Sequence, residues 1–307
     1  MSFEIQNQVL DDSCRGGFVG RLWVAIRPRT LPIAIAPVLV SAGVSTYADS
    51  VTWITVLFAL LGAILLTIGA NLANDLYDYL NGADTNDRIG PVRVSQAGWF
   101  TPRQMRLAIA VVFCAATLVG AILTYFGGWP VIILGLMAIS AAILYTGGPW
   151  PLGYHGLGEL LVFLFYGPIA VCGTVWVATQ SLPLLVWPVS VPVGLLAAAV
   201  LLVNNIRDIE TDGRAKKRTL VVRIGRKWGI RLYGICCGVS LILPLFLWIS
   251  GWVSWVILLP MFLFPRMRAL IRTVSDSTNG PVLNMALAST AKVLVGYAGL
   301  LFAGLVL

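Results

Sequence analysis

Charged residues are scarce in this 307-residue chain, where Asp, Glu, Lys and Arg together make up 11% of the sequence. An ordinary soluble domain carries about 25% charged residues. Hydrophobic residues reach 58% and the mean hydropathy is +0.88, so a water-soluble globular domain is excluded. Because every backbone polar group inside a bilayer needs an internal partner, long apolar runs of this kind predict an all-α integral membrane protein.

Histidine is nearly absent, and the cysteines lack the spacing of a metal site. The one histidine, His155, lies in a glycine-rich loop, and we expect it to be structural or merely exposed. Of the five cysteines, four lie in apolar runs, where small buried apolar side chains are expected. The net charge of +8 is not accompanied by a nucleic-acid-binding motif, so no nucleic-acid partner is expected.

The first 20 residues lack the basic segment and the apolar core of a cleavable signal peptide. We expect residues 1–20 to be a polar cytoplasmic segment and residues 21–307 to form a single transmembrane domain. A membrane-spanning helix needs about 20 mostly apolar residues. By this measure the chain has nine predicted spans, at roughly 22–47, 53–74, 105–126, 129–146, 158–179, 184–206, 230–249, 252–265 and 283–307.

Lysine and arginine residues gather in alternate loops of this nine-span arrangement. The loops after the second, sixth and eighth spans are basic, whereas the loops after the first, third, fifth and seventh spans contain neither residue. Because basic loops stay in the cytoplasm, the N-terminus is predicted inside and Leu307 outside a bacterial plasma membrane or its equivalent.

Carboxylates and side-chain amides recur at the cytoplasmic ends of two predicted spans. They are Asn74, Asp75 and Asp78 at the second span, and Asn204, Asp208 and Asp212 at the sixth. Four-residue spacing places side chains on one helix face. Carboxylates at membrane depth are costly and usually functional, and their oxygens suit hard cations such as Mg²⁺. Helix capping explains either cluster alone, but matched clusters on one side of the membrane favour a binding site.

Basic residues follow both acidic clusters. They are Arg88 and Arg93 after the first cluster, and Lys216, Lys217 and Arg218 after the second. Guanidinium and ammonium groups suit phosphate oxygens, although loop Lys and Arg can also serve topology alone. A metal ion would bridge the carboxylates to a diphosphate that the carboxylates alone would repel. The pattern therefore predicts a site for a Mg²⁺–diphosphate ligand at the membrane surface.

Further motifs are spread over nearly the whole chain. They are Arg27-Pro28-Arg29-Thr30-Leu31-Pro32, Gly82-x-Asp84-x-x-x-Arg88-x-Gly90-Pro91-x-Arg93, Gly153-Tyr154-x-Gly156-Leu157-Gly158-Glu159, Asn204-Asn205-x-Arg207-Asp208 and Lys217-Arg218-Thr219-Leu220. With the Asn-Asp-x-x-Asp run at 74–78, they resemble the UbiA superfamily of intramembrane prenyltransferases, and within it the 1,4-dihydroxy-2-naphthoate branch. The resemblance implies a nine-helix bundle, the number that the hydropathy pattern also predicts.

The resemblance implies transfer of a polyprenyl group from polyprenyl diphosphate to 1,4-dihydroxy-2-naphthoate, with loss of diphosphate and carbon dioxide. The implied metal ligands, for two Mg²⁺ ions or alternatively Mn²⁺, are Asn74, Asp75, Asp78, Asp84, Asn204, Asp208 and Asp212. Many family members have a third acid where this chain has Gly82, and Asp84 is its nearest replacement. The implied catalytic residues are Asp78, Asp208, Asp212 and Tyr145. The implied diphosphate ligands are Arg88, Arg93, Lys216, Lys217 and Arg218, and the implied acceptor contacts are Arg27, Arg29, Tyr145 and Glu159.

Three other functions remain open at this point. The same fold could prenylate another aromatic acceptor, such as 4-hydroxybenzoate, homogentisate or chlorophyllide. A cation-coupled transporter also carries intramembrane acids, but it would place them nearer mid-membrane than these span-end clusters. A non-enzymatic quinone- or lipid-binding scaffold would not need two metal-type clusters. Prenyl length and oligomeric state are not specified by these patterns.

Overall fold

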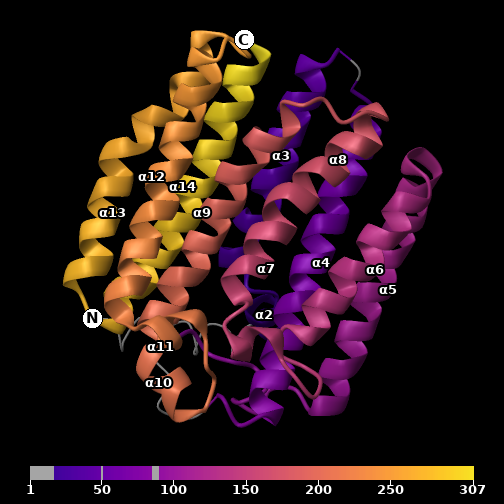
Figure 1. The fold of residues 1–307 in the computed structure, drawn as a ribbon. Coiled ribbons are helices and arrows are strands. Elements are labelled where there is room, and N and C mark those ends of the chain that lie inside the picture. Colours follow the sequence, from indigo (N-terminus) through magenta and orange to yellow (C-terminus); the bar gives the residue numbers. More distant parts are fainter. Residues whose placement is uncertain (1–16, 50, 85–89) are drawn as a thin grey trace.

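A computed structural model of the protein describes residues 17–49, 51–84 and 90–307. These residues form helices and contain no strand. Figure 1 shows the long helices running side by side, with the short helices α10 (Ile209–Arg214) and α11 (Leu220–Ile224) at one end of the bundle. We call this end the site end, because both acidic motifs lie there. The all-α bundle predicted from composition is therefore confirmed.

The other helices follow one another along the chain. In chain order they are α2 (Gly17–Ile26), η1 (Pro28–Thr30), α3 (Pro32–Tyr47), α4 (Trp53–Leu80), α5 (Pro102–Gly127), α6 (Trp129–Leu144), η2 (Leu152–His155), α7 (Gly158–Leu164), η3 (Phe165–Ile169), α8 (Ala170–Thr179), α9 (Val186–Arg207), α12 (Arg226–Ile249), η4 (Trp255–Leu263), α13 (Phe264–Asp276) and α14 (Gly280–Val306). The long apolar runs thus become helices, as the sequence predicts.

The predicted number of nine spans is approximate. Within the described ranges, six helices are long and apolar enough to cross a membrane: α4, α5, the run Gly158–Thr179, α9, α12 and α14. The segments Gly17–Thr30 and Pro32–Tyr47 form a seventh span if they are counted together. The span predicted at 129–146 is the 16-residue helix α6. The span predicted at 252–265 is the 3₁₀ helix η4, which continues into α13.

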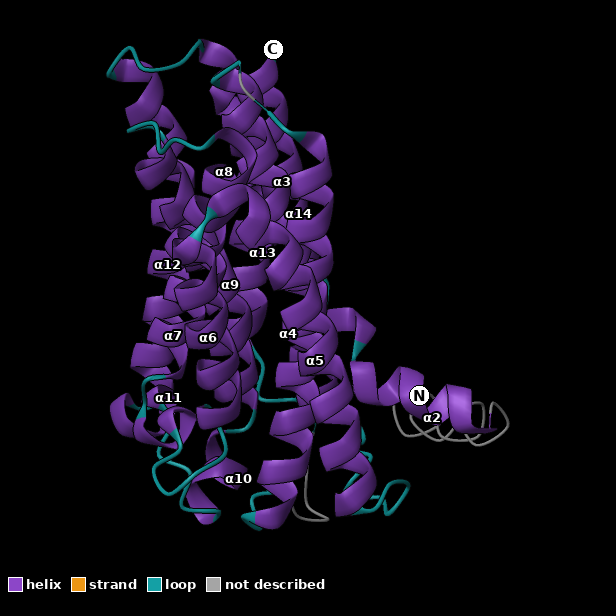
Figure 2. Cartoon of the chain, turned by 90° about the vertical axis from the view of Figure 1, so that its right-hand side faces the viewer, coloured by secondary structure: helices purple, strands orange, loops and turns teal. Residues whose placement is uncertain are grey.

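The first predicted span, 22–47, is broken. Arg27 adopts a left-handed backbone conformation (φ 57°) and is followed by Pro28, and a further proline, Pro32, starts α3. Because proline cannot donate a helix hydrogen bond and restricts the residue before it, the helix stops and restarts. The two halves meet at an angle of 50°. Figure 2 shows α2 leaving the bundle sideways near the site end.

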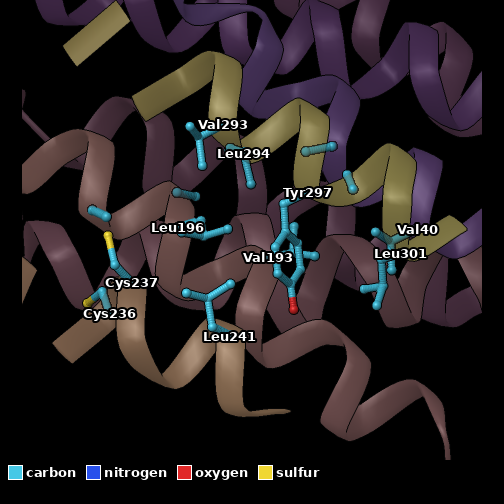
Figure 3. Close-up of a cluster of buried hydrophobic side chains, with 14 of the residues drawn as sticks. Val40, Val193, Leu196, Cys236, Cys237, Leu241, Val293, Leu294, Tyr297 and Leu301 are labelled. Atoms are coloured by element: carbon cyan, nitrogen blue, oxygen red, sulfur yellow. The ribbon is translucent and has the colours of Figure 1, made fainter. Parts of the chain in front are cut away.

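Helix α9 lies at the centre of the bundle. Of its most apolar stretch 72% is buried, against 28% for α4 and for α5. Figure 3 shows side chains of α9, α12, α14 and α3 packed together, among them Val193, Leu196, Cys236, Cys237, Leu241, Val293, Leu294, Tyr297, Leu301 and Val40. The buried Tyr297 hydroxyl donates to the Ser240 carbonyl (2.6 Å). Because lipid tails are as apolar as these side chains, close packing stabilises this core more than transfer from water does.

The cysteines divide between this core and the surface. Cys236 and Cys237 are buried, as predicted, and Cys172 is partly buried. The same expectation is wrong for Cys114, which is exposed on α5. The reason is that apolar side chains face lipid as well as the core, and apolarity alone does not distinguish these two surroundings.

Two glycines let η3 and α9 touch at the backbone. A Cβ added to Gly194 would lie 2.5 Å from the Phe163 carbonyl oxygen, and one added to Gly167 would lie 2.8 Å from the Gly194 Cα. Gly167 also has a non-helical backbone (φ −106°, ψ −108°) inside the π-helical turn η3. The run from 158 to 179 therefore bends where it packs against α9. Several residues of this run line the cavity described below.

Helix α13 replaces a predicted loop. Arg266, Arg268 and Arg272 were expected between the eighth and ninth spans, but they lie within the 13 residues of α13. Met267, Leu270 and Val274 face the core at helical spacing, while the arginines are exposed. An apolar stripe three to four residues apart is sufficient for an amphipathic helix, whatever the charge on its other face.

Candidate active site

A cavity of about 670 Å³ lies among helices α3 to α9. Its polar lining is at the site end and includes Asn74, Asp84, Arg93, Asn204, Asp208, Asp212 and Lys217. Deeper in the bundle its walls are apolar and include Ala59, Gly62, Leu123, Val131 and Val177. From Asn74 to Ala59 the cavity follows α4 for about 22 Å, at 1.5 Å per residue. The cavity thus joins an ionic end to a deep apolar channel.

The first acidic motif surrounds Arg93. Arg93 Nη2 lies 3.1 Å from Asp78 Oδ2, and Arg93 Nε lies 3.2 Å from Asp84 Oδ2. Asp78 is 0% exposed, Arg93 3% and Asp84 8%. A buried charge is costly unless it is paired, so Arg93 holds the two acids together at the end of α4. The sequence predicted Arg93 as a phosphate ligand and gave no indication of these ion pairs.

Asp75 faces the loop that follows α4. Its carboxylate accepts hydrogen bonds from the backbone N–H groups of Val94 (3.3 Å) and Ser95 (2.9 Å). Arg27 Nη2 lies 3.8 Å from the same carboxylate. Asp75 does not line the cavity, although it was expected among the metal ligands. Asp75 therefore has a structural role, because its hydrogen bonds hold in place the loop that carries Arg93.

Tyr154 is a site residue that the sequence did not reveal. Its hydroxyl donates to Asp78 Oδ1 over 2.7 Å. Burial, followed by the negative charge of Asp78, raises the pKa of Tyr154, so the phenol stays protonated and remains a donor. Tyr154 belongs to the Gly153-Tyr154-x-Gly156 run, which marks the position but does not indicate its partner.

Arg207 forms a buried ion pair in the second acidic motif, as Arg93 does in the first. It forms a two-pronged ion pair with Asp208, in which Nε lies 2.7 Å from Oδ1, and its Nη2 donates to Asn204 Oδ1 (2.9 Å). It also donates to Asn284 of α14. Helix α9 ends at Arg207 and α10 starts at Ile209, so the predicted continuous helical stripe is broken at Asp208. Three of its residues still line the cavity, namely Asn204, Asp208 and Asp212.

Lys217 links the two motifs. Its Nζ lies 3.5 Å from Asp78 Oδ2 and 3.9 Å from Asp212 Oδ1, and it sits 5.2 Å from the centre of the Tyr154 ring. The side chain of Lys217 is 15% exposed. Residues from the second and the sixth predicted spans thus line one cavity, and the Lys217 cation lies between Asp78 and Asp212.

The predicted acceptor residues divide into two groups. Tyr145 and Arg27 line the cavity, whereas Arg29 is exposed and does not. A Cβ on Gly158 would lie 2.8 Å from the Tyr145 hydroxyl, so the glycine lets α7 approach this tyrosine. Glu159 is buried behind the wall, where Asn205 Nδ2 donates to it over 2.8 Å. Asn205 does line the cavity, so Glu159 is connected to the cavity only through its hydrogen bond with the Asn205 amide.

The predicted diphosphate ligands also differ in position. Arg93 and Lys217 line the cavity. Lys216 and Arg218 are exposed and do not line it. Arg88, like most of the polar segment 1–20, lies outside the described residues. His155 stacks on Trp150 with ring centres 4.0 Å apart, in agreement with the structural role expected for it.

The oxygen atoms at the site end fit a divalent cation that a substrate helps to bind. In the part of the chain that the structure describes, no three His, Cys, Asp or Glu side chains are grouped to hold a metal by themselves. Mg²⁺ is commonly held by one or two carboxylates together with substrate phosphates and water. Asn74 Oδ1 is buried without a hydrogen-bond partner, and Asn74 lines the same cavity as Asp208 and Asp212. These hard oxygens suit Mg²⁺ completed by a diphosphate.

Fold and site together define an integral membrane protein with a polar site at the mouth of an apolar channel. A profile of the UbiA prenyltransferase family matches residues 34–305. This chain therefore belongs to the UbiA prenyltransferase family, as the sequence motifs predicted.

Several known proteins are similar to this chain. It is 43% identical over 204 residues to a protein of Mycobacterium tuberculosis named 1,4-dihydroxy-2-naphthoate octaprenyltransferase, covering 66% of this chain and 70% of the relative. A protein of the same name from Mycobacterium leprae is 34% identical over 277 residues, covering 90% and 93%. Among solved structures, a UbiA homologue from Archaeoglobus fulgidus has a TM-score of 0.65 at 14% identity, covering 94% of this chain and 100% of that one. At that identity the structural likeness shows the shared fold alone.

Proposed function

We propose that this protein transfers a polyprenyl group from polyprenyl diphosphate to 1,4-dihydroxy-2-naphthoate, releasing diphosphate and carbon dioxide. One observation carries the proposal: both acidic motifs and Lys217 meet at the polar mouth of a single, otherwise apolar cavity. A lipid-tailed diphosphate has the same division between an ionic head and an apolar tail. Relatives that share up to 43% identity with this chain bear the corresponding name.

The donor is expected to lie along the cavity. Its diphosphate would lie beside Lys217 and Arg93, whose positive charges offset the negative charge of the leaving group. Its tail would lie against Gly62, Leu123 and Val177, away from water. Loss of the diphosphate leaves an allylic cation, which water would otherwise capture. An apolar channel that excludes water therefore protects the reactive intermediate.

The proposed metal ligands are the cavity oxygens of Asn74, Asp84, Asn204, Asp208 and Asp212. Asp78 does not line the cavity, but it pairs with Arg93 and Lys217, which do. Mg²⁺, when bound, neutralises the diphosphate and makes it a better leaving group. Arg93 and Arg207 hold Asp78, Asp84 and Asp208 in place by buried ion pairs. A UbiA homologue from Archaeoglobus fulgidus has been solved with DMAPP and Mg²⁺, which supports the use of a divalent cation in this family.

The acceptor ring is expected to lie beside Tyr145, whose own ring lines the cavity. An aromatic face stabilises a nearby cation, so Tyr145 would favour the allylic cation and orient the acceptor. Arg27 lines the same cavity and offers a guanidinium for the acceptor carboxylate. Attack on the allylic cation by the ring carbon that carries the carboxylate forms the new carbon–carbon bond. The bond to the carboxylate then breaks, carbon dioxide leaves, and the electron pair of that bond restores the aromatic ring.

We propose that the site end faces the cytoplasm. The described basic residues of the loops gather at this end, including Arg93, Lys216, Lys217 and Arg218. Positive residues are retained on the cytoplasmic side during membrane insertion. The water-soluble acceptor would then enter from the cytoplasm, while the donor enters from the bilayer.

The test is an in vitro prenylation assay. Purified protein in proteoliposomes is incubated with Mg²⁺, a ladder of prenyl diphosphates and one acceptor at a time, and products are identified by mass. The expected result is a decarboxylated prenyl naphthalene product that disappears when a chelator is added. A product from 4-hydroxybenzoate or homogentisate alone would instead assign another acceptor.

A matched pair of variants tests the acidic motif. Asp208→Asn keeps the size of the side chain but removes its charge, and we expect activity to fall at least 100-fold, as for loss of a charged group at a transition state. Asp276→Asn removes an acid at the end of α13, away from the cavity, and should leave the rate unchanged. Near-normal activity of Asp208→Asn at saturating Mg²⁺ would count against the proposed site.

A further inference from the structure

Three arginines lie on the exposed face of a helix at the edge of the bundle. Arg266, Arg268 and Arg272 lie on α13, which Figure 1 shows on the outside of the molecule beside α12 and α14. The surface around them is apolar: Phe262 is 79% exposed and Phe264 53% exposed. Exposed side chains on an outer helix of a membrane bundle face lipid, so these cations have an unusual position.

The depth of the arginines follows from the anchoring of α13. Arg226, at the start of α12, donates to the carbonyls of Val274 (2.9 Å) and Ser277 (2.7 Å) at the end of α13. This fixes the last turn of α13 at the site end. At 1.5 Å per residue, Arg272 lies about 6 Å and Arg268 about 12 Å from Asp276 towards the bundle centre. If Asp276 lies at the edge of a hydrocarbon core about 30 Å thick, both arginines lie within the half of that core nearest the site end.

Among the residues that the structure describes, no acidic side chain forms an ion pair with these cations. The one acid of α13, Asp276, lies at its far end. A charged side chain at bilayer depth costs free energy unless it reaches the headgroups or meets a counter-charge. The anion available there is the phosphate of a phospholipid.

The spacing suits a single phosphate. Arg268 and Arg272 are four residues apart, which places them as neighbours on one helix face. Two guanidinium groups on one face can grip one phosphate with several charge-assisted hydrogen bonds. On the adjacent helix α12, Arg231 stacks over the ring of Trp228 at 4.6 Å, and Trp228 is 57% exposed. A tryptophan with a cation is typical of the headgroup level of a membrane.

We propose that the exposed face of α13 binds an anionic phospholipid, whose phosphate is held by Arg268 and Arg272. The site is separate from the active-site cavity, which none of the α13 residues lines. Its expected ligand is a lipid with net negative charge, because a zwitterionic headgroup brings a competing positive charge.

Native mass spectrometry of the full chain in detergent tests the proposal, with phosphatidylglycerol compared against phosphatidylcholine. The wild type is expected to retain phosphatidylglycerol preferentially. Arg268→Gln/Arg272→Gln should weaken this retention about 10- to 30-fold, as expected for two surface charges. The control, Arg103→Gln/Arg106→Gln, removes equal charge from the exposed start of α5 and should change retention less than about threefold.

Three results would overturn the proposal. The first is a wild type without preference for the anionic lipid, and the second is equal loss in the two double variants, which would mean unspecific attraction. The third is a lipid-independent dimer that the α13 variant turns into a monomer, because a second copy would then cover this face. Melting temperatures of both variants in the same detergent check that each remains folded.

Discussion

At the scale of single residues, the site is organised by two buried arginines. Arg93 pairs with Asp78 and Asp84 of the first motif, and Arg207 pairs with Asp208 of the second. Removing one partner of a buried ion pair usually costs 3–5 kcal/mol, roughly, because the other charge stays behind. The arginines thus keep closely spaced acids in place before any cation or substrate arrives. Lys217 is less enclosed and stands between the motifs.

Lys217 provides the sharpest test at this scale. Lys217→Gln removes the cation that lies within 4 Å of both Asp78 and Asp212. A charge-assisted contact is worth about 1.5–3 kcal/mol, so we expect the KM for the diphosphate donor to rise roughly 10- to 100-fold. Steady-state kinetics with a fixed acceptor measures this change.

The neighbouring Lys216 is the matched control for this prediction. It is exposed, does not line the cavity, and carries the same charge one residue away. Lys216→Gln should therefore leave the KM for the donor within about twofold. Equal effects of the two substitutions would mean that overall charge, rather than the position of Lys217, attracts the donor.

At the scale of elements, the bends matter more than the straight helices. The break at Arg27, the π-helical turn at Gly167 and the break at Asp208 each place a cavity wall or a site residue. At Gly167 and Gly194 two backbones meet without side chains between them. This contact positions the run Gly158–Thr179 against the central helix.

Gly194→Val is predicted to destabilise this crossing. The added Cβ would lie 2.5 Å from a backbone carbonyl, which cannot move aside as a flexible side chain would. Overpacking of this kind costs about 1–3 kcal/mol, so the melting temperature in detergent should fall. Gly238→Val on α12 is the control, because a Cβ there meets nothing within 4 Å. An unchanged melting temperature of Gly194→Val would show that the crossing can relax.

Much of the element pattern could be predicted from the sequence. Long apolar runs predicted α4, α5, α9, α12 and α14 because a bilayer allows no other regular structure for them. The helix α13 was missed because its arginines were assigned to a loop, although its buried Met267, Leu270 and Val274 keep helical spacing. The bend at Gly167 was missed because it depends on the partner helix, which local sequence does not specify.

The site was predicted less completely than the fold. The position of both acidic motifs on the same side of the membrane predicted one binding site, and Asn74 and Asp208 do line one cavity. The ion pairs of Arg93 and the hydrogen bond from Tyr154 to Asp78 were not predicted. They join residues far apart in the chain, and their geometry depends on how the loops fold over the helix ends.

At the scale of the whole molecule, the cavity follows the length of the bundle. Its polar mouth lies at the site end, and its apolar part continues beside α4 as far as Ala59. Its depth sets a limit on the donor tail that fits inside. The molecule is therefore divided along its axis into an ionic end and an apolar remainder.

Blocking the deep part of the cavity should change donor choice. Ala63→Phe places a large side chain in the apolar wall, about 16 Å along α4 from Asn74. We expect the ratio of kcat/KM for long to short donors to fall at least tenfold, as measured by competition between two prenyl diphosphates. Leu61→Phe is the control, because Leu61 is 44% exposed and lies outside the cavity lining. Unchanged donor preference in Ala63→Phe would mean that the tail lies elsewhere.

The two ends of the molecule give a topology prediction. Figure 1 shows the C-terminus at the end opposite α10 and α11. If the site end is cytoplasmic, alkaline phosphatase fused after Leu307 should be active in a bacterial host, because it folds only outside the cytoplasm. The same enzyme fused after Asp276, at the site end of α13, should be inactive. The reverse pattern would overturn the proposed orientation.

The central position of α9 has a consequence for how the protein responds to bilayers of different thickness. Helices at the rim, such as α4 and α5, must tilt or shift when a bilayer thickens or thins. The second acidic motif instead lies at the end of α9, whose apolar stretch is 72% buried by protein. A mismatch between helix length and bilayer thickness therefore affects this motif only through the neighbouring helices. Growth temperature and lipid saturation should therefore disturb the first motif, at the end of α4, before they disturb the second.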